Sequence, residues 1–178
     1  ATANLTGGLV VNDFATVKNK TGATINAGAV TVDTFGVINN YEGATLAYAS
    51  VDADGIVRNL GTLNVTGTYA IGDEGETTFA GDTKVGTLSI GRTAKTMLMA
   101  RDGQEAVLHN TGKTYADELD LVSGQVMVEK DSILAGKSLK NGAVGSDIIV
   151  SAGGTFGFSH DKSSLENALK NYTGSKAD

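Results

Sequence analysis

A short phrase recurs along this chain: an aliphatic residue, one spacer, Asn, one or two further residues and Gly, followed by alternating Thr and aliphatic residues. Residues 17–25, 38–46 and 57–65 follow it closely, and residues 108–115 follow it loosely. Successive leading glycines lie 18 to 26 residues apart, a period typical of solenoids and other repeat proteins. Such a repeat restricts the chain to folds in which similar units stack on one another.

The chemistry of this unit predicts its shape. Alternating Thr and aliphatic residues suit a pleated strand with one face buried. Asn and Gly tolerate a positive φ, which we expect a sharp corner between two strands to require. We therefore interpret each unit as a strand, an Asn/Gly corner and a second strand. The predicted corner residues are Asn19, Gly22, Asn40, Gly43, Asn59, Gly61, Asn110 and Gly112.

Stacked units of this kind form a parallel β-helix, in which each strand hydrogen-bonds to its counterparts about 4.8 Å above and below. We predict an all-β fold in which residues 1–160 form this solenoid, with roughly seven coils in a rod about 35 Å long. Residues 117–122, 125–128 and 147–150 are further predicted strands.

The alternative fold is an antiparallel β-sandwich, which also has short strands separated by turn signals. A sandwich has no reason to repeat the same phrase at coil spacing, and it usually has a larger aromatic core. This chain has only 5 Phe, 5 Tyr and no Trp. These two features favour the solenoid.

Two segments depart from the repeat. Residues 92–106 lack a regular Gly corner, and a strand pair, a short helix or an excursion from the coil all fit them. Residues 161–178 contain a capping box at 163–166, followed by apolar residues at helical spacing. This pattern predicts a helix over 163–172, which we expect to cover an open coil end and shield its unpaired strand edges.

Charge and composition exclude several classes of function. The 14 Lys and Arg against 20 Asp and Glu give a net charge of −6, and no basic patch indicates a nucleic-acid partner. The chain has no Cys, which excludes a disulfide framework, a zinc–thiolate cluster and a thiol nucleophile. No apolar run approaches the roughly 18 residues of a membrane span, so we expect no membrane insertion of this segment. The absence of an initiator Met indicates a processed product or an excised piece.

No catalytic motif is present in the sequence. A Gly-x-Ser-x-Gly elbow, a P-loop and a dinucleotide fingerprint are all absent, and we expect the chain not to be an enzyme. His109 occupies an outward spacer position of a repeat, which predicts a solvated surface residue. His160 precedes the predicted terminal helix and is interpreted as a loop or capping residue.

Acidic residues in predicted turns are the remaining candidates for a metal site, because loop carboxylates can hold calcium. Some β-helix lyases use calcium beside a basic residue that abstracts the proton. Turn formation and solubility explain the same residues more simply. We therefore expect no cofactor, with calcium as the alternative. The calcium candidates are Asp52, Asp54, Asp73, Glu74 and Glu76.

The repeated units, including residues 57–67 and 151–156, resemble the passenger regions of bacterial autotransporters and related large surface adhesins. The absence of Cys is also similar to that family, whose chains cross the periplasm unfolded. The resemblance covers about residues 15–160. It implies a right-handed parallel β-helix on the cell surface and carries over no catalytic residue. The chain is shorter than such passengers, which indicates a fragment or a short subunit of something larger.

Three hypotheses of function follow. The first is a non-enzymatic structural and adhesive module of a secreted, extracellular bacterial surface protein, which acts by display, adhesion or self-association. Its partners would be proteins or glycans of host or bacterial surfaces, or further copies of itself. The second is a secreted subunit that polymerises end to end into a filament, because open coil ends are templates for strand addition. The third is a lyase-like or hydrolase-like β-helix enzyme, or a fragment of one, that acts on polysaccharides.

Overall fold

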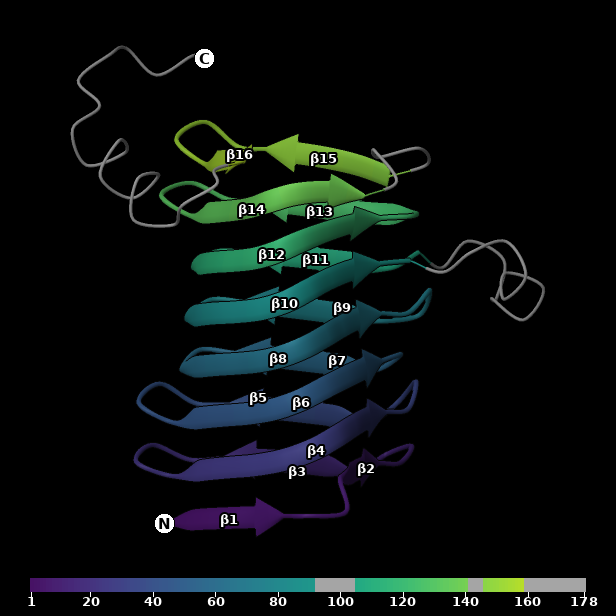
Figure 1. The fold of residues 1–178 in the computed structure, drawn as a ribbon, viewed down its shortest axis with the longest axis vertical. Coiled ribbons are helices and arrows are strands. Elements are labelled where there is room, and N and C mark those ends of the chain that lie inside the picture. Colours follow the sequence, from purple (N-terminus) through teal and green to yellow (C-terminus); the bar gives the residue numbers. More distant parts are fainter. Residues whose placement is uncertain (92–104, 141–145, 159–178) are drawn as a thin grey trace.

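The computed structural model describes residues 1–91, 105–140 and 146–158 (Figure 1). The regular elements within these ranges are all strands, and every strand pairing is parallel. The predicted β-solenoid is therefore confirmed, and the antiparallel sandwich is excluded. None of the described segments forms a helix that is long and apolar enough to cross a bilayer.

Each full coil contributes one strand to each of two sheets. One of the two sheets consists of the longer strands, and this long-strand sheet faces the viewer in Figure 1. Its N-terminal layer is split into two short strands, which pair with successive halves of the first long strand. Its members are β1 (Thr2–Leu5), β2 (Leu9–Val11), β4 (Thr24–Val32), β6 (Thr45–Ala53), β8 (Thr62–Ile71), β10 (Asp82–Ile90), β12 (Lys113–Leu121), β14 (Ile133–Lys140) and β16 (Thr155–Phe158).

The short-strand sheet lies behind it and contains seven strands, one for each coil. The predicted count of about seven coils is thus confirmed. The predicted strands at 117–122, 125–128 and 147–150 correspond to β12, β13 and β15. The members of this sheet are β3 (Thr16–Asn19), β5 (Val37–Asn40), β7 (Ile56–Asn59), β9 (Glu76–Phe79), β11 (Val107–Asn110), β13 (Gly124–Val128) and β15 (Ser146–Val150).

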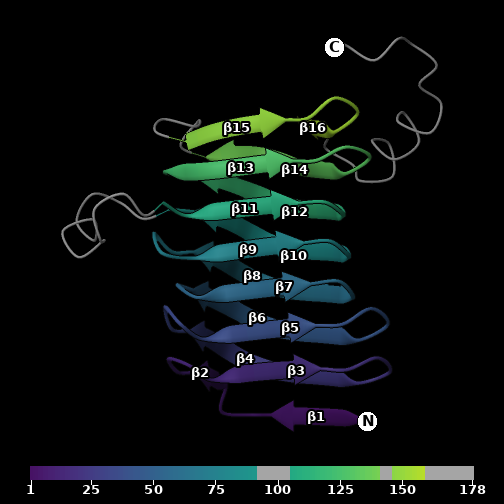
Figure 2. The ribbon, with the colours of Figure 1, turned by 180° about the vertical axis from the view of Figure 1, so that it is seen from behind.

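The coil is right-handed. In Figure 1 the long strands run from left to right across the front, and the chain then returns behind them and reappears one layer higher. Figure 2 shows the same path from behind. Connections between parallel strands favour this hand strongly, because of the right-handed twist of strands. The hand agrees with what the resemblance to autotransporter passengers implies.

The core is a narrow column of aliphatic side chains stacked coil upon coil. Leu46 lies in register with Leu63, and Val51 lies in register with Tyr69. Two of the few interior aromatic residues contact each other, since the rings of Tyr69 and Phe79 meet edge to face at 5.2 Å. Alternation of Thr and aliphatic residues therefore places one aliphatic row in the interior and one polar row outside, as expected for strands.

Several predictions fall outside the described residues. The helix over 163–172, the separate unit at 161–178 and His160 all lie there. Most of the irregular segment 92–106 does so too.

Candidate functional site

The corners between the short and the long strands differ in length, and this difference shapes one edge of the molecule. Four residues form the corner in the first two coils and in the last two. Only two residues form it in the three coils between them, where Leu60–Gly61, Ala80–Gly81 and Thr111–Gly112 connect the strands. Figure 1 shows the long corners projecting at the left edge and the short corners ending flush with the sheet.

Glycine serves two purposes in these corners. Gly22 and Gly43, in the long corners, have φ values of 75° and 73°, as expected for a turn that needs positive φ. The short-corner glycines instead stack directly on the coil below. A Cβ at Gly81 would lie 2.0 Å from the carbonyl oxygen of Gly61, and one at Gly112 would lie 2.3 Å from that of Gly81. Tight stacking, with no room for a side chain, requires glycine there.

The four predicted corner asparagines end β3, β5, β7 and β11, and all four side chains are buried. Asn19 Nδ2 donates a hydrogen bond of 2.9 Å to Asn40 Oδ1, and Asn40 Nδ2 donates one of 2.7 Å to Asn59 Oδ1. Asn110 Nδ2 donates to the carbonyl oxygen of Ile133, in the next coil, at 2.9 Å. These side chains therefore bond the first three coils to one another, and the Asn110 coil to the coil above it, inside the corner.

The positive φ that we expected of these asparagines is wrong. The non-glycine residues with positive φ in the described ranges are Phe14 and Asp131. The asparagines end extended strands, and they are needed because an amide both donates and accepts within a buried ladder. Phe79 occupies the corresponding position between Asn59 and Asn110 and interrupts the ladder.

The three short corners form the floor of a notch between the longer corners on either side. This hollow has a volume of about 400 Å³. Leu60, Ala80 and Thr111 line it along the corner, and the Gly43 and Asp131 corners close its two ends. The notch extends across three coils, parallel to the axis of the solenoid.

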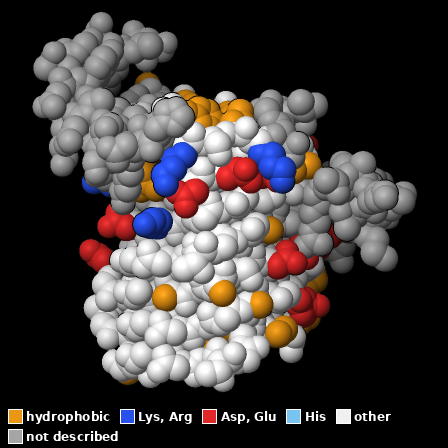
Figure 3. Space-filling view, viewed as in Figure 1, with side chains coloured by type: hydrophobic (Ala, Val, Ile, Leu, Met, Phe, Trp, Pro, Cys, Tyr) orange, Lys and Arg blue, Asp and Glu red, His pale blue; other side chains and the backbone are white. Residues whose placement is uncertain are grey.

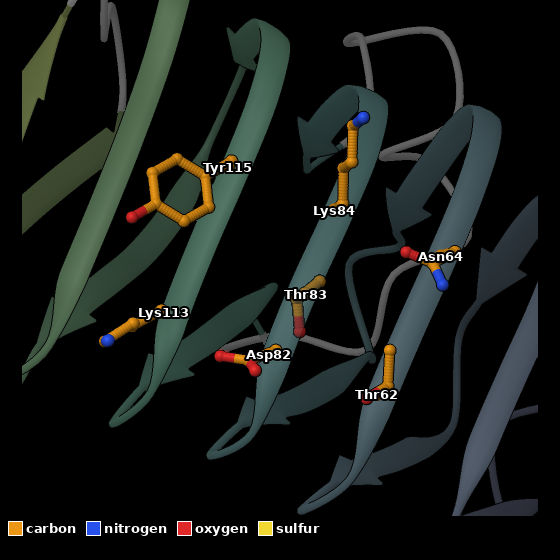
Figure 4. A pocket seen from close by; sticks show the side chains of 7 residues that line it. All are labelled: Thr62, Asn64, Asp82, Thr83, Lys84, Lys113 and Tyr115. Carbon is orange, nitrogen blue, oxygen red and sulfur yellow. The ribbon is translucent and has the colours of Figure 1, made fainter. Parts of the chain in front are cut away.

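A second hollow of about 240 Å³ lies next to the notch on the face of the long-strand sheet (Figure 4). The two hollows share Thr62, Asp82 and Lys113 and therefore adjoin each other. We call the two hollows together the corner groove. The second hollow adds four side chains, from β8, β10 and β12: Asn64, Thr83, Lys84 and Tyr115.

Three charged side chains of the groove, Asp82, Lys84 and Lys113, form no ion pair with a described side chain, although they stand in neighbouring strands. Asp82 and Lys113 are register partners in β10 and β12 and are both exposed. No described partner lies within ion-pair distance of Asp82, Lys84 or Lys113. Further along the same face the charges do pair across coils. Lys137 Nζ lies 2.5 Å from an Asp117 carboxylate oxygen, and Lys140 Nζ lies 3.4 Å from one of Asp120.

The rest of this face is almost free of charge near the N-terminus. The outward positions of β4, β6 and β8 carry Thr, Asn, Ser, Ala and Gly, with Asp52 as the one charged exception. Figure 3 shows this region as the pale lower part of the surface, with acidic residues along its right border and the basic residues above it. One threonine row stacks in register on this face: Thr2, Thr24, Thr45 and Thr62.

The calcium candidates lie at three places in the coils. Asp52 faces outward on β6, and Asp54 lies in the turn that follows. Asp73 and Glu74 lie in the turn after β8, where Glu74 accepts a hydrogen bond of 2.8 Å from the hydroxyl of Thr34. Glu76 begins β9. Within the described ranges, no three acidic or histidine side chains are grouped so that they could hold a metal ion.

His109 lies on the outer face of β11 and is half-exposed, as its spacer position predicts. It borders a wide, shallow hollow of about 630 Å³. The other side chains of this hollow include Glu74, Glu76, Glu105 and Gln125. It is more acidic than the corner groove and has no basic residue besides the imidazole.

Sequence reasoning missed the groove residues Asp82, Lys84 and Lys113. The sequence does contain a signal for the short corners, because the spacing from Asn to Gly shortens from three residues at Asn40 to two at Asn59.

We compared the chain with family models, with curated proteins and with solved structures, and none of them matches it.

Proposed function

We propose that this chain is a non-enzymatic structural and adhesive module of a secreted bacterial surface protein, similar to an autotransporter passenger. The right-handed parallel solenoid is consistent with such a role, although this fold supports many functions. The periodic resemblance over residues 15–160 and the absence of Cys support the choice of family. In this proposal the chain is extracellular and acts by presenting its outer surfaces to proteins, glycans or other copies of itself.

The observation that carries the proposal is the corner groove on an otherwise regular rod. Buried asparagines hydrogen-bond the first three coils to one another, and parallel strand pairing joins all the coils. The groove breaks this regularity at three successive corners and gathers polar side chains of both charges at its rim. A rigid scaffold that presents exposed polar groups suits recognition of a surface partner.

The test of adhesion uses beads coated with the full chain. We expect these beads to bind bacterial or host-cell surfaces above the level of albumin-coated beads. An antibody against the chain should also label intact cells of the source bacterium as strongly as permeabilised cells. Beads that bind no better than albumin would contradict adhesion, and labelling that needs permeabilised cells would contradict surface exposure.

The enzyme alternative has its own test. The chain is incubated with acidic and neutral polysaccharides, with calcium and with a chelator, and the polymer length is followed by chromatography. We expect no change of length under any condition. Calcium-dependent shortening of an acidic polymer that is lost in an Asp52→Asn or Asp73→Asn variant would replace the adhesive proposal with a lyase.

A specific observation favours the filament as a second candidate. β1 and β3 stand at the outer ends of their sheets, and the backbone edges of such strands are templates for pairing. Val10 and Phe14 near this end are 63% and 84% exposed. We expect light scattering to rise with concentration if the chain polymerises through this end. A chain that stays monomeric at high concentration has no filament function.

A further inference from the structure

We propose that the corner groove binds a neutral oligosaccharide, which lies along the solenoid axis across three coils. This inference rests on the proposed adhesive function and names the chemical class of its partner. It is argued from the shape of the groove, from the charges at its rim and from the ion pair that Asp82 and Lys113 do not form with each other.

The shape of the groove favours a linear ligand. Its floor is formed by the two-residue corners of three successive coils, which stack along the axis of the solenoid. The longer corners at Gly43 and Asp131 rise at either end. A hollow three coils tall and closed at both ends fits a short extended chain better than the convex surface of a folded protein.

The rim chemistry favours a ligand that is rich in hydroxyl groups. The Asp82 carboxylate accepts hydrogen bonds, the Lys113 and Lys84 ammonium groups donate them, and Asn64 can do both. A sugar hydroxyl also donates and accepts, so it can satisfy each of these groups in turn. Figure 4 shows that these side chains extend from three adjacent strands toward the same side of the sheet.

The charges argue against a polyelectrolyte ligand. Asp82 and Asp131 balance Lys84 and Lys113 around the groove, so it presents neither a cationic nor an anionic field. Polyanions are bound by clusters of basic residues and are released by salt. A neutral ligand suits a mixed rim, and its affinity should change little with salt because screening acts on charges.

The missing contacts give the groove its capacity to bind. Asp82 and Lys113 are register partners but form no ion pair with a described side chain, whereas Asp117 and Lys137 on the same face do pair. A hydroxyl placed between these two side chains can accept a hydrogen bond from the Lys113 ammonium group and donate one to the Asp82 carboxylate. Such charge-assisted hydrogen bonds are stronger than neutral ones. The exposed aliphatic side chain of Leu60 supplies an apolar contact for the C–H face of a sugar ring.

The test uses defined probes that match the length of the groove: trisaccharides of glucose, mannose and N-acetylglucosamine, with trigalacturonate as the anionic comparison. Binding is measured by calorimetry and located by amide chemical-shift changes in the full chain. We expect at least one neutral trisaccharide to shift the amides of residues 60–64, 80–84 and 111–115, with an affinity insensitive to salt. Asp82→Asn and Lys113→Met should each weaken binding about tenfold or more.

Two further variants separate groove filling from loss of fold. Ala80→Trp places a large ring at an exposed corner position in the notch and should abolish binding while the urea midpoint stays unchanged. Lys137→Met, on the same face but outside the groove, should bind as the wild type does. The inference fails if no neutral probe shifts the groove amides at millimolar concentration, if the shifts map elsewhere, or if only trigalacturonate binds.

The bead assay distinguishes the two proposals. Adhesion that persists in Ala80→Trp leaves the adhesive function standing and overturns the role of the groove in it. Wild-type beads that do not adhere, combined with trisaccharide shifts at the groove, overturn the adhesive function and support the binding site.

Discussion

Asn40 and Asn59, which are 19 residues apart in the chain, are joined by a fully buried hydrogen bond of 2.7 Å from Nδ2 to Oδ1. The same Asn40 amide also donates to the carbonyl oxygen of Thr62, at 3.0 Å. One side chain therefore bonds two sites in the coil above it. Substituting Asn40 therefore tests how much these buried side-chain hydrogen bonds contribute to holding the coils together.

Asn40→Ala should destabilise the fold strongly. The substitution leaves the Asn59 Oδ1 and the Thr62 carbonyl without this donor in a buried corner, and each unsatisfied buried group costs about 1–3 kcal/mol. We expect a loss of about 3 kcal/mol in the free energy of unfolding, measured by urea denaturation. The matched control is Asn39→Ala, since Asn39 precedes it and faces outward on β5. That control should change the free energy by less than about 0.5 kcal/mol, and equal effects of both variants would contradict the ladder.

Gly81→Ala should show how closely the short corners stack. The added Cβ would lie 2.0 Å from one backbone oxygen and 2.6 Å from another, which side-chain motion cannot relieve. We expect a loss of about 1–3 kcal/mol or more, as for other overpacked sites. Gly7→Ala is the control, because a Cβ there meets nothing within 4 Å. Thermal melting of both variants checks this, and a Gly81→Ala protein as stable as the Gly7→Ala protein would show that the corners can separate.

Two buried tyrosines should respond oppositely to loss of their hydroxyl groups. The Tyr48 hydroxyl is buried and has no hydrogen-bond partner in the described part of the chain, whereas that of Tyr69 lies 3.0 Å from the Thr77 hydroxyl. Tyr48→Phe should raise the free energy of unfolding by about 1 kcal/mol, because an unsatisfied polar group is removed. Tyr69→Phe should lower it by about 1 kcal/mol. Urea midpoints compare the two, and changes of the same sign would refute this account.

The raised pKa values of the same two tyrosines predict that the free energy of unfolding falls at alkaline pH. Burial raises the pKa of both phenols, and the hydrogen bond between the Tyr69 and Thr77 hydroxyls lowers the pKa of Tyr69 in part. A raised pKa in the folded state means that the unfolded chain releases these protons first, near pH 10. Stability is therefore complete below about pH 10 and falls above it, by up to about 1.4 kcal/mol per pH unit for each tyrosine. Urea titrations at several pH values measure the slope, and Tyr48→Phe should reduce it. A slope that is unchanged in this variant would assign the alkaline loss to other groups.

Strand polarity and stacking could be predicted from the sequence because the repeat is local. The alternation at residues 62–65 and the recurrence of Asn and Gly are periodic patterns. Such patterns can be recognised in the sequence without knowing which residues are in contact. The role of Asn40 was predicted wrongly, since an extended Asn and one with positive φ look the same in a sequence. Only the register of β5 on β7 shows that its amide meets Asn59.

The corner groove could not be predicted in the same way. Asp82 and Lys113 are 31 positions apart, and residues 92–104 between them interrupt the period, so spacing does not place them in register. Phe79 adds to the difficulty, because it takes the place of an Asn and removes the phrase from that coil. Where the repeat is irregular, the register of strand pairing can be read only from the structure.

Corners of two and of four residues join the same stacked positions, which has a consequence for how such a rod can change. Two residues inserted at residues 60–61, together with two deleted at 129–132, would shift the recess by one coil while all strands keep their neighbours. Evolution or protein engineering could therefore move a binding site along the solenoid axis by small insertions and deletions in the corners, without changing the buried core.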